Sequence, residues 1–415
     1  MSGSAARATA IRLSALFFLQ AHAQALWYVP FSSILRSHGL DWLTPYTFAG
    51  MALAALIPPM LGGALADQHL RAERLLGGLC IGVAGMLALV FTAIQNEWGG
   101  GWVLSLLFVQ QLLFAPAGSL VVAIVLAGVE DPERQYGPIR VWGTYGWLVA
   151  APLLSLVLQV DTSPLAGYIA AAGYLVVAAF AFSLPDSRAS TRSASRRWRD
   201  LLGNDTLFLL RDRDVRIVFV TAGLFSMPLA AFYPFTPLFL RDVGVQHASA
   251  AMSLGQVTEV IASYALAPLF AAVRLKWILL AGLFFGVLRY VLYAMTALPL
   301  VYVGISLHGF CYTLFFISAQ LYLERRIDPQ YRTRAQAFLT LMMLGVGNFA
   351  GSLGGGWLRD WCSNEAGTDW RLYWSILAGV ALVVLGYFAV RFREEETVEV
   401  EPIPGELPLT KLPTE

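Results

Sequence analysis

The feature that most constrains the fold of this chain is a succession of apolar stretches, each long enough to cross a lipid bilayer. A bilayer core is about 30 Å thick, so a spanning helix needs roughly 20 mostly apolar residues. We therefore predict an all-α integral membrane protein with twelve transmembrane helices. Their expected positions are 11–35, 45–66, 74–95, 102–129, 139–160, 164–184, 216–240, 249–273, 277–297, 299–323, 334–357 and 371–392.

The bulk composition agrees with a chain that has lipid as its solvent. Hydrophobic residues make up 57% of the 415 residues and charged residues only 13%, with a mean hydropathy of +0.63. Soluble domains are about half apolar and about a quarter charged. The net charge of +1 leaves no basic surplus to neutralise phosphates, so we expect a lipid bilayer and no nucleic acid as the partner of this surface.

The sequence offers no chemistry for catalysis. Cys80, Cys311 and Cys362 lie far apart, so they predict neither a disulfide framework nor a metal site. We find no nucleophile–base pair, no metal-ligand spacing and no phosphate-binding loop. We therefore expect a protein that is not an enzyme and that uses no cofactor or metal.

A polar segment divides the twelve predicted helices into two groups of six. We predict an N-terminal six-helix bundle at 1–184, a basic linker at 185–215, a C-terminal six-helix bundle at 216–393 and a disordered tail at 394–415. The linker is rich in arginine and serine, a composition that cannot form a core. Two bundles joined by one connection are typical of secondary transporters.

The distribution of arginine and lysine between loops predicts the orientation. If both termini are cytoplasmic, most basic residues fall on the cytoplasmic side, as the positive-inside rule requires. The opposite side then carries only Arg36, Arg241, Arg359 and Arg371. We predict a multi-pass protein of the bacterial cytoplasmic (inner) membrane with both termini in the cytoplasm, working as a monomer.

A glycine-rich segment between the second and third predicted helices matches a known signature in part. The sequence reads GGALAD from Gly62 to Asp67, and Arg71 follows. This pattern resembles the loop signature of the major facilitator superfamily, although Gln68 and Leu70 replace its usual basic residue and glycine. The resemblance implies that Gly62, Asp67 and Arg71 form a conformational motif. An ordinary glycine-rich helix end has a similar composition.

Polar side chains inside the predicted spans are the candidate functional groups, because each costs free energy in hydrocarbon and tends to face a cavity. Arg140, Thr144 and Trp147 have the spacing i, i+4, i+7, so they share one helix face. This face combines a cation, a hydroxyl and an aromatic plate, which suits a planar polar solute. The alternative is that Arg140 reaches out to the cytoplasmic interface.

A carboxylate lies near the middle of the eighth predicted span. Glu259 shares a helix face with Gln256, three residues earlier. A carboxylate removed from water is suited to bind and release a proton, so we predict that Glu259 couples transport to protons. The alternative is a glutamate held permanently by a buried arginine, and Arg289 in the ninth span is available for that role.

The tenth predicted span carries further polar and aromatic groups. His308, Tyr312 and Phe316 follow one another at i, i+4, i+8, with Thr313 beside them. A single histidine in a helix is equally typical of a structural hydrogen bond. His22 in the first span, with its flanking glutamines, adds polar groups to a possible cavity.

At these residues the chain resembles the nucleoside:proton symporter family of the major facilitator superfamily. The resemblance covers nearly the whole chain and is strongest at 139–146 (IRVWGTYG), 246–249 (QHAS), 308–312 (HGFCY) and 334–348. It implies the major facilitator fold of two six-helix bundles. It also implies proton-coupled nucleoside uptake by alternating access, with a nucleoside and a proton as the bound species.

The resemblance also implies roles for individual residues. Arg140, Thr144, Gln256 and Glu259 match the binding positions of the family, and Trp147 and Tyr312 stand where aromatic residues are expected. The chain departs from the family at Thr313, where an aspartate is usual, and in the seventh span, where Ala230 and Tyr233 replace polar amides. We include Tyr233 and Thr313 among the candidate solute-binding residues.

These departures keep two alternatives open. One is a facilitator or symporter for another small polar solute, such as a sugar, because lost polar partners change which solutes a buried site accepts. The other is a non-transporting membrane receptor, which would bind a ligand without exchanging it across the bilayer.

Overall fold

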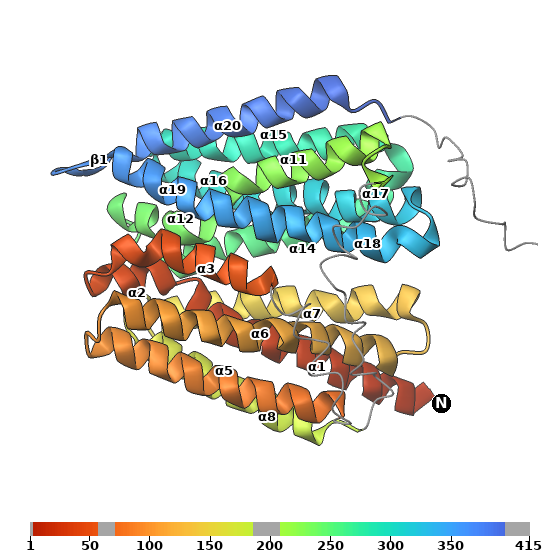
Figure 1. Cartoon of the computed structure of the whole chain (residues 1–415), viewed down its shortest axis with the longest axis horizontal. Helices are drawn as coiled ribbons and strands as arrows, with labels where there is room; N and C mark the ends of the chain where they lie inside the picture. Colours follow the sequence, from red (N-terminus) through yellow and green to blue (C-terminus); the bar gives the residue numbers. More distant parts are fainter. Residues whose placement is uncertain (1–2, 57–70, 186–207, 395–415) are drawn as a thin grey trace, which may run out of the picture.

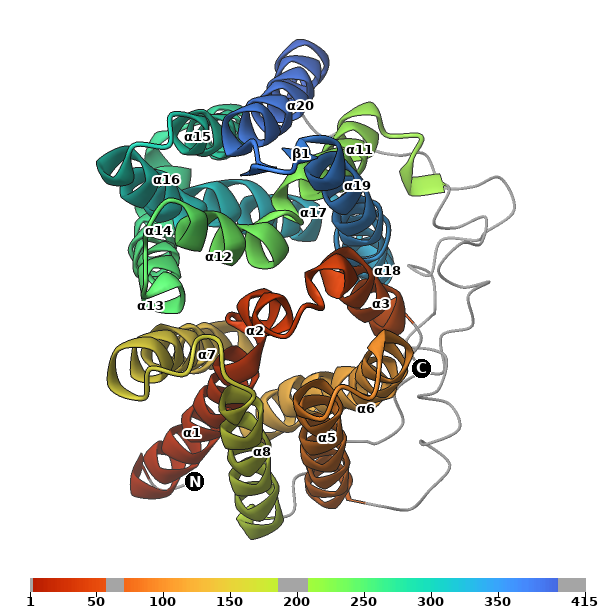
Figure 2. The same cartoon turned by 90° about the vertical axis from the view of Figure 1, so that its left-hand side faces the viewer.

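The computed structural model describes residues 3–56, 71–185 and 208–394. Within these residues the helices form twelve rods in two bundles, one from each half of the chain (Figure 1). The N-terminal half packs mainly through α1 against α7 and through α5 against α6 and α8, whereas the C-terminal half packs through α15 against α16 and α20. Figure 2 shows the two bundles facing each other along one interface.

The N-terminal bundle contains six rods. The chain breaks its first rod at Val29 and Pro30, because proline has no N–H to continue the helical ladder. The elements are α1 (Gly3–Tyr28), α2 (Phe31–Ser37), the 3₁₀ turn η1 (Asp41–Leu43), α3 (Thr44–Leu56), α5 (Ala72–Gln95), α6 (Gly100–Gly128), α7 (Pro132–Pro152) with the π-helical turn η2 (Leu153–Val157), and α8 (Leu165–Ser183).

The C-terminal bundle also contains six rods, four of which are interrupted. Two of the interruptions are π-helical turns, which widen a helix locally and are frequent at functional sites. The elements are α11 (Arg213–Leu229), α12 (Phe232–Asp242), α13 (Ala248–Met252), α14 (Leu254–Ala272), α15 (Leu275–Ala294), α16 (Leu298–Cys311), η3 (Tyr312–Ile317), α17 (Ser318–Arg326), α18 (Pro329–Thr340), η4 (Leu341–Gly347), α19 (Asn348–Trp361) and α20 (Trp370–Arg391). A short hairpin, β1 (Ser363–Asn364) with β2 (Gly367–Thr368), joins α19 to α20.

The two ends of the molecule differ in their basic residues. We call the end at which α1 begins and α20 finishes the terminal end, and the opposite end the hairpin end (Figure 1). The four arginines predicted to face away from the cytoplasm lie together at the hairpin end. They are Arg36 in α2, Arg241 in the last turn of α12, Arg359 in the last turn of α19, and Arg371 at the start of α20.

The surface fits a bilayer. Within the described ranges, nine helices are long and apolar enough to cross a membrane. Tryptophans of the kind that anchor a protein at the lipid–water interface are exposed at the hairpin end, on η1, near the start of α6 and in the last turns of α19. These are Trp42, Trp98, Trp102, Trp357 and Trp361. The prediction of an all-α membrane protein with twelve helices is confirmed.

One predicted boundary was wrong in a way that matters for the site. Helix α7 begins at Pro132, well before the predicted start at 139. The Asp131 side chain caps it by accepting from the Arg134 backbone N–H at 3.2 Å, and a proline stands in the first turn, where it is common in helices. Arg140 therefore lies inside the helix rather than at its start.

Other predicted features fall largely outside the described residues. Gly62 and Asp67 lie there, as do most of the predicted linker 185–215 and nearly all of the predicted tail 394–415. Arg71 is described and precedes the first turn of α5. Each bundle has its own hydrophobic core, and Trp147 and Tyr233 pack against both cores.

Candidate functional site

A cavity of about 1150 Å³ lies between the two bundles. Its walls come from α1, α3, α6 and α7 of one bundle and from α11, α12, α14, α16 and α19 of the other. The lining extends toward the terminal end as far as Gly137 and Pro138 in the first turns of α7. Seven of the eight residues predicted to bind solute or carry protons line this cavity. They are Arg140, Thr144, Trp147, Tyr233, Gln256, Glu259 and Tyr312.

The Glu259 side chain interacts with the opposite bundle. Its carboxylate lies near the Thr144 hydroxyl and close enough to Arg140 for their charges to attract. Glu259 belongs to α14, whereas Thr144 and Arg140 belong to α7, so this group of three residues bridges the interface. The alternative partner, Arg289, instead bonds with His308. The carboxylate of Glu259 and the guanidinium of Arg140, both predicted from the sequence as site residues, therefore face each other at the cavity.

A close helix contact holds Glu259 in place. Gly309 on α16 packs so tightly against α14 that an added Cβ would overlap the Glu259 backbone nitrogen and the Gly255 carbonyl oxygen. Only glycine allows this approach, because any side chain would push the helices apart. Gln256, one turn before Glu259, is buried and lines the cavity beside it.

Aromatic rings from both bundles close the cavity toward the hairpin end. The ring of Tyr233 lies 5.1 Å from that of Tyr28 and 5.7 Å from that of Trp147, between centroids. Tyr28 also contacts Trp147 and Phe48 edge to face. Aromatic rings in such arrangements pack closely. We call the rings of Tyr28, Phe48, Trp147 and Tyr233 the aromatic roof; both bundles contribute to it, and it includes the candidate stacking residue Trp147.

Two of the candidate residues do not reach the cavity together with the others. Thr313 is completely buried in η3, and its hydroxyl has no hydrogen-bond partner within the described residues. It follows Tyr312, which lines the cavity. His22 turns toward α7, where its Nδ1 lies 3.1 Å from the Gly146 carbonyl oxygen.

The structure adds lining residues that the sequence did not single out as part of a site. Ser226, Ser263 and Tyr264 face the cavity from α11 and α14. Single serines and tyrosines in apolar helices occur for many reasons, so the sequence carried no signal for them. His308, for which a structural hydrogen bond was the alternative, lines the cavity as well, and so does Asn348.

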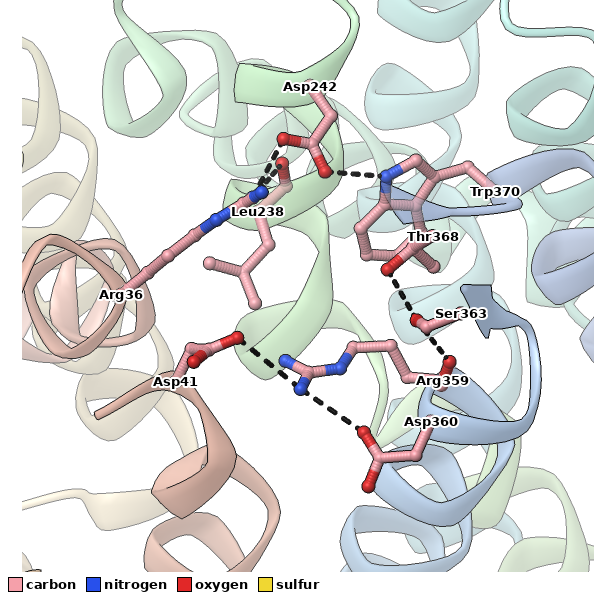
Figure 3. Close-up of polar contacts among 9 residues, drawn as sticks. All are labelled: Arg36, Asp41, Leu238, Asp242, Arg359, Asp360, Ser363, Thr368 and Trp370. Atoms are coloured by element: carbon pink, nitrogen blue, oxygen red, sulfur yellow. Dashed lines mark hydrogen bonds and ion pairs between the residues drawn. The ribbon is translucent and has the colours of Figure 1, made fainter. Parts of the chain in front are cut away.

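Two ion pairs join the bundles at the hairpin end, beyond the aromatic roof (Figure 3). Arg36 of α2 pairs with Asp242 of α12, with Nη1 2.8 Å from Oδ1. Asp41 of η1 pairs with Arg359 of α19, with Oδ2 3.5 Å from Nη2. We call these two pairs the latch. Each bundle contributes one arginine and one aspartate to it.

Neighbouring groups within the C-terminal bundle orient the latch. The Trp370 indole N–H donates to Asp242 Oδ2 at 2.8 Å, and Arg359 also donates to Asp360 at 3.2 Å. Ser363 at the hairpin donates to the Arg359 carbonyl oxygen at 2.7 Å (Figure 3). The latch and the aromatic roof thus both join the two bundles between the cavity and the hairpin end.

The arrangement therefore suits binding and release rather than catalysis. The cavity holds a carboxylate near a guanidinium, amides and aromatic rings. Within the described residues no group of histidine, cysteine or acidic side chains could hold a metal ion.

Comparison with known sequences agrees with this geometry. The profile of the family described as Nucleoside H+ symporter matches residues 7–397. YegT of Escherichia coli strain K12 is 30% identical over 407 residues, which cover 94% of this chain and 95% of that protein. The xanthosine permease of the same organism is 27% identical over 413 residues, covering 93% and 97%.

Solved structures show the same fold. The crystal structure of the nucleoside transporter NupG superimposes with a TM-score of 0.80 at 24% identity, covering 93% of this chain and all of that one. A D-xylose–proton symporter matches with a TM-score of 0.63 at 10% identity, covering 91% and 95%. The predicted fold of two six-helix bundles is confirmed.

Proposed function

The chain belongs to the nucleoside H+ symporter family, and from this premise we propose how its own residues carry out proton-coupled nucleoside uptake. The observation that carries the proposal is that Glu259 of one bundle faces Arg140 and Thr144 of the other in the same cavity. A group that joins the two bundles at the cavity can sense both the proton and the solute, because either one changes its interactions.

Glu259 is the proton-binding residue of this proposal. While its carboxylate is charged, it attracts Arg140 across the cavity. Protonation removes that attraction and frees the Arg140 guanidinium to donate to a solute oxygen or ring nitrogen. Proton and solute binding are thereby linked, since the solute gains its cationic partner when Glu259 is neutral.

The remaining candidate residues hold the nucleoside. Thr144 and Gln256 supply hydrogen bonds for ribose hydroxyls or base edges, and Tyr312, Tyr233 and Trp147 supply aromatic surface for the base. Thr313, next to Tyr312 in η3, is buried and does not line the cavity, so we assign it no direct contact with the solute. The conformational motif Gly62, Asp67 and Arg71 is proposed to guide the movement of the bundles.

Alternating access is the movement that we propose. The units are 1–184 and 216–393, joined by 185–215 and followed by the tail 394–415, and they rock about the cavity. The positive-inside rule supports a cytoplasmic location for the terminal end, because only the four arginines named above are assigned by the sequence to the hairpin end, and most basic residues are assigned to the other side. Because contacts between the bundles lie on the hairpin side of the cavity, we propose that this arrangement is the inward-facing state. We propose that the protein works as a monomer in the bacterial inner membrane.

The direct test is uptake of radiolabelled adenosine and uridine into proteoliposomes, with and without an inward proton gradient. We expect accumulation only with the gradient. Glu259→Gln should abolish accumulation but preserve counterflow, because it mimics a permanently protonated acid. The control Glu324→Gln changes an exposed carboxylate that pairs with Arg332 at 3.6 Å and should leave accumulation intact.

The outcomes separate the alternatives. Retained accumulation in Glu259→Gln would contradict its coupling role. Equilibration without accumulation in the unmodified protein would indicate a facilitator. Uptake of neither nucleoside, with competition by a sugar in a binding assay, would favour the other small polar solutes, whereas binding without counterflow would indicate a receptor.

A further inference from the structure

Arg289 is a fully buried cation that lies behind the cavity wall. It sits on α15 with none of its surface exposed. Its guanidinium carbon lies 4.5 Å from the centroid of the Phe232 ring and 4.7 Å from that of Tyr290. Its Nη2 donates to the Tyr290 hydroxyl at 3.3 Å. Aromatic faces and a hydroxyl thus surround a charge that is costly to bury without a purpose.

The shortest contact of Arg289 is with a histidine of the cavity wall. Its Nη1 lies 2.7 Å from Nδ1 of His308 on α16. A guanidinium can only donate hydrogen bonds, so Nδ1 of His308 must be the acceptor and carry no proton. The neutral imidazole then has its proton on Nε2. A doubly protonated ring would set an N–H against an N–H and a second positive charge beside the first.

The residue that accepts from Arg289 is also part of the cavity wall. His308 lines the cavity whereas Arg289 does not, and Nε2 lies on the ring edge away from the arginine. Of the two ring nitrogens of His308, only Nδ1 has a hydrogen-bond partner among the described residues. The Phe232 ring stacks on the imidazole with centroids 4.0 Å apart and holds its plane.

From this geometry we infer that Arg289 is a positioning residue, which fixes His308 as a neutral Nε2–H donor aimed at an acceptor atom of the bound solute. The acceptor is a carbonyl oxygen or an unprotonated ring nitrogen, such as a nucleobase presents, and this part of the inference rests on the proposed function. His308 is then a specificity-determining residue, because an unpaired donor in this wall disfavours solutes without an acceptor there.

The inference also assigns different roles to the two titratable side chains at this wall. His308 keeps its charge state because Arg289 and Tyr290 of α15 and the Cys311 thiol lie on its buried side. Tyr233 of α12 and Tyr312 of η3 border it with neutral rings. Glu259 of α14 faces Arg140 instead. Glu259 therefore changes charge during transport, and His308 does not.

Nitrogen NMR of the full-length protein in lipid bilayers tests the positioning role without any solute. The chain has five histidines, so ¹⁵N-histidine labelling gives few signals, and the His308→Gln variant identifies the one that belongs to His308. We expect an unprotonated Nδ1 and a protonated Nε2 that do not change between about pH 5.5 and 8, a range that spans the ordinary histidine pKa. A protonated Nδ1, or conversion to imidazolium within this range, would overturn the inference.

Paired substitutions of the arginine distinguish positioning from a structural role. Arg289→Gln retains an amide N–H that can donate to Nδ1, whereas Arg289→Met does not. We expect the Gln variant to keep the single tautomer and the Met variant to show a mixture or a titrating ring. Identical spectra in the unmodified protein and a folded Met variant would refute the positioning role. If the Met variant does not fold, the spectrum of the unmodified protein still decides the matter.

Transport kinetics test the donor role. His308→Gln retains both an acceptor for Arg289 and a donor for the solute, so KM for uridine or adenosine should rise less in this variant than in His308→Phe. His308→Phe removes both and should raise KM about tenfold, the value of one buried hydrogen bond. An unchanged KM in the Phe variant would refute the donor role. Failure to take up either nucleoside would refute the proposed function, and the NMR result would remain.

Discussion

The latch should control how often the cavity opens toward the hairpin end. We consider a double variant, Asp41→Asn with Asp242→Asn, which removes the negative charge from both ion pairs and changes little else. The amide oxygen introduced at position 242 can still accept from the Trp370 indole, which now donates to the Asp242 carboxylate at 2.8 Å. The substitution therefore isolates the attraction between the bundles from the packing around it.

The expected size follows from the exposure of the charges. The side chains of Arg36 and Asp242 are 41% and 28% exposed, so their pair should contribute about 0.5 kcal/mol. The Arg359 side chain is only 11% exposed and its pair with Asp41 should contribute about 1 kcal/mol. The sum of about 1.5 kcal/mol corresponds to roughly a tenfold change in the ratio of open to sealed states.

Thiol labelling measures this ratio. Ser263→Cys places a thiol on α14 at the cavity wall, in a background in which Cys80, Cys311 and Cys362 are replaced by alanine. A membrane-impermeant maleimide applied from the hairpin side reaches this thiol only when the seal opens. We expect labelling to be about ten times faster in the double variant, because the opened fraction rises by that factor.

A matched control and a rescue make the reasoning refutable. Asp360→Asn removes the other carboxylate that contacts Arg359, at 3.2 Å, but this contact lies within one bundle, so labelling should not become faster. Arg36→Asp alone sets two carboxylates against each other and should accelerate labelling, and adding Asp242→Arg should slow it again. Equal rates in the double variant and the unmodified protein, or equal acceleration by Asp360→Asn, would show that the latch does not hold the bundles together.

Three further predictions concern single residues. Gly309→Ala should reduce stability by about 1–3 kcal/mol and lower the thermal unfolding temperature, because its Cβ would overlap the backbone of α14. Gly354→Ala, whose Cβ meets nothing within 4 Å, should leave the unfolding temperature unchanged. Equal effects of the two substitutions would contradict the packing argument. Trp147→Ala should weaken nucleoside binding by roughly 1–3 kcal/mol in a titration if its ring stacks on the base, whereas Trp277→Ala, exposed and away from the cavity, should not. Burial, and to a smaller extent the charge of the nearby Asp369, raises the pKa of the Cys362 thiol above its usual 9.0. A maleimide at about neutral pH should therefore label Cys362 more slowly than an exposed cysteine, and the rate should increase with rising pH. A rate equal to that of free cysteine would argue against its burial.

The sequence predicted the architecture because hydrophobic length is a strong signal in a membrane protein. Each span must satisfy its own backbone within the bilayer, so helix number and the division into two halves follow from apolar runs. The start of α7 was wrong because Arg134 and Gln135 broke the apolar run while Asp131 and Pro132 still began a helix. The first turns of α7 are polar, so a search for apolar runs missed them, although the capping residue Asp131 marks the start of the helix.

The site was predictable only where a charge lay within a span. Arg140 and Glu259 were recognisable because a charged group in hydrocarbon needs a reason, and the structure places them near each other. Their partners depend on how helices pack, so the sequence left Arg289 as a possible partner for Glu259. The contact of Arg289 with His308 became visible only once α15 and α16 were placed side by side.

The latch also bears on where the bundles meet when they close. Arg36 and Asp41 come from one bundle, and Asp242 and Arg359 come from the other. A closure shifted along the interface by the spacing of the pairs would bring arginine to arginine or aspartate to aspartate, and like charges repel. The opposite orientation of the two ion pairs therefore favours a single relative position of the bundles, to which they return at the end of every transport cycle.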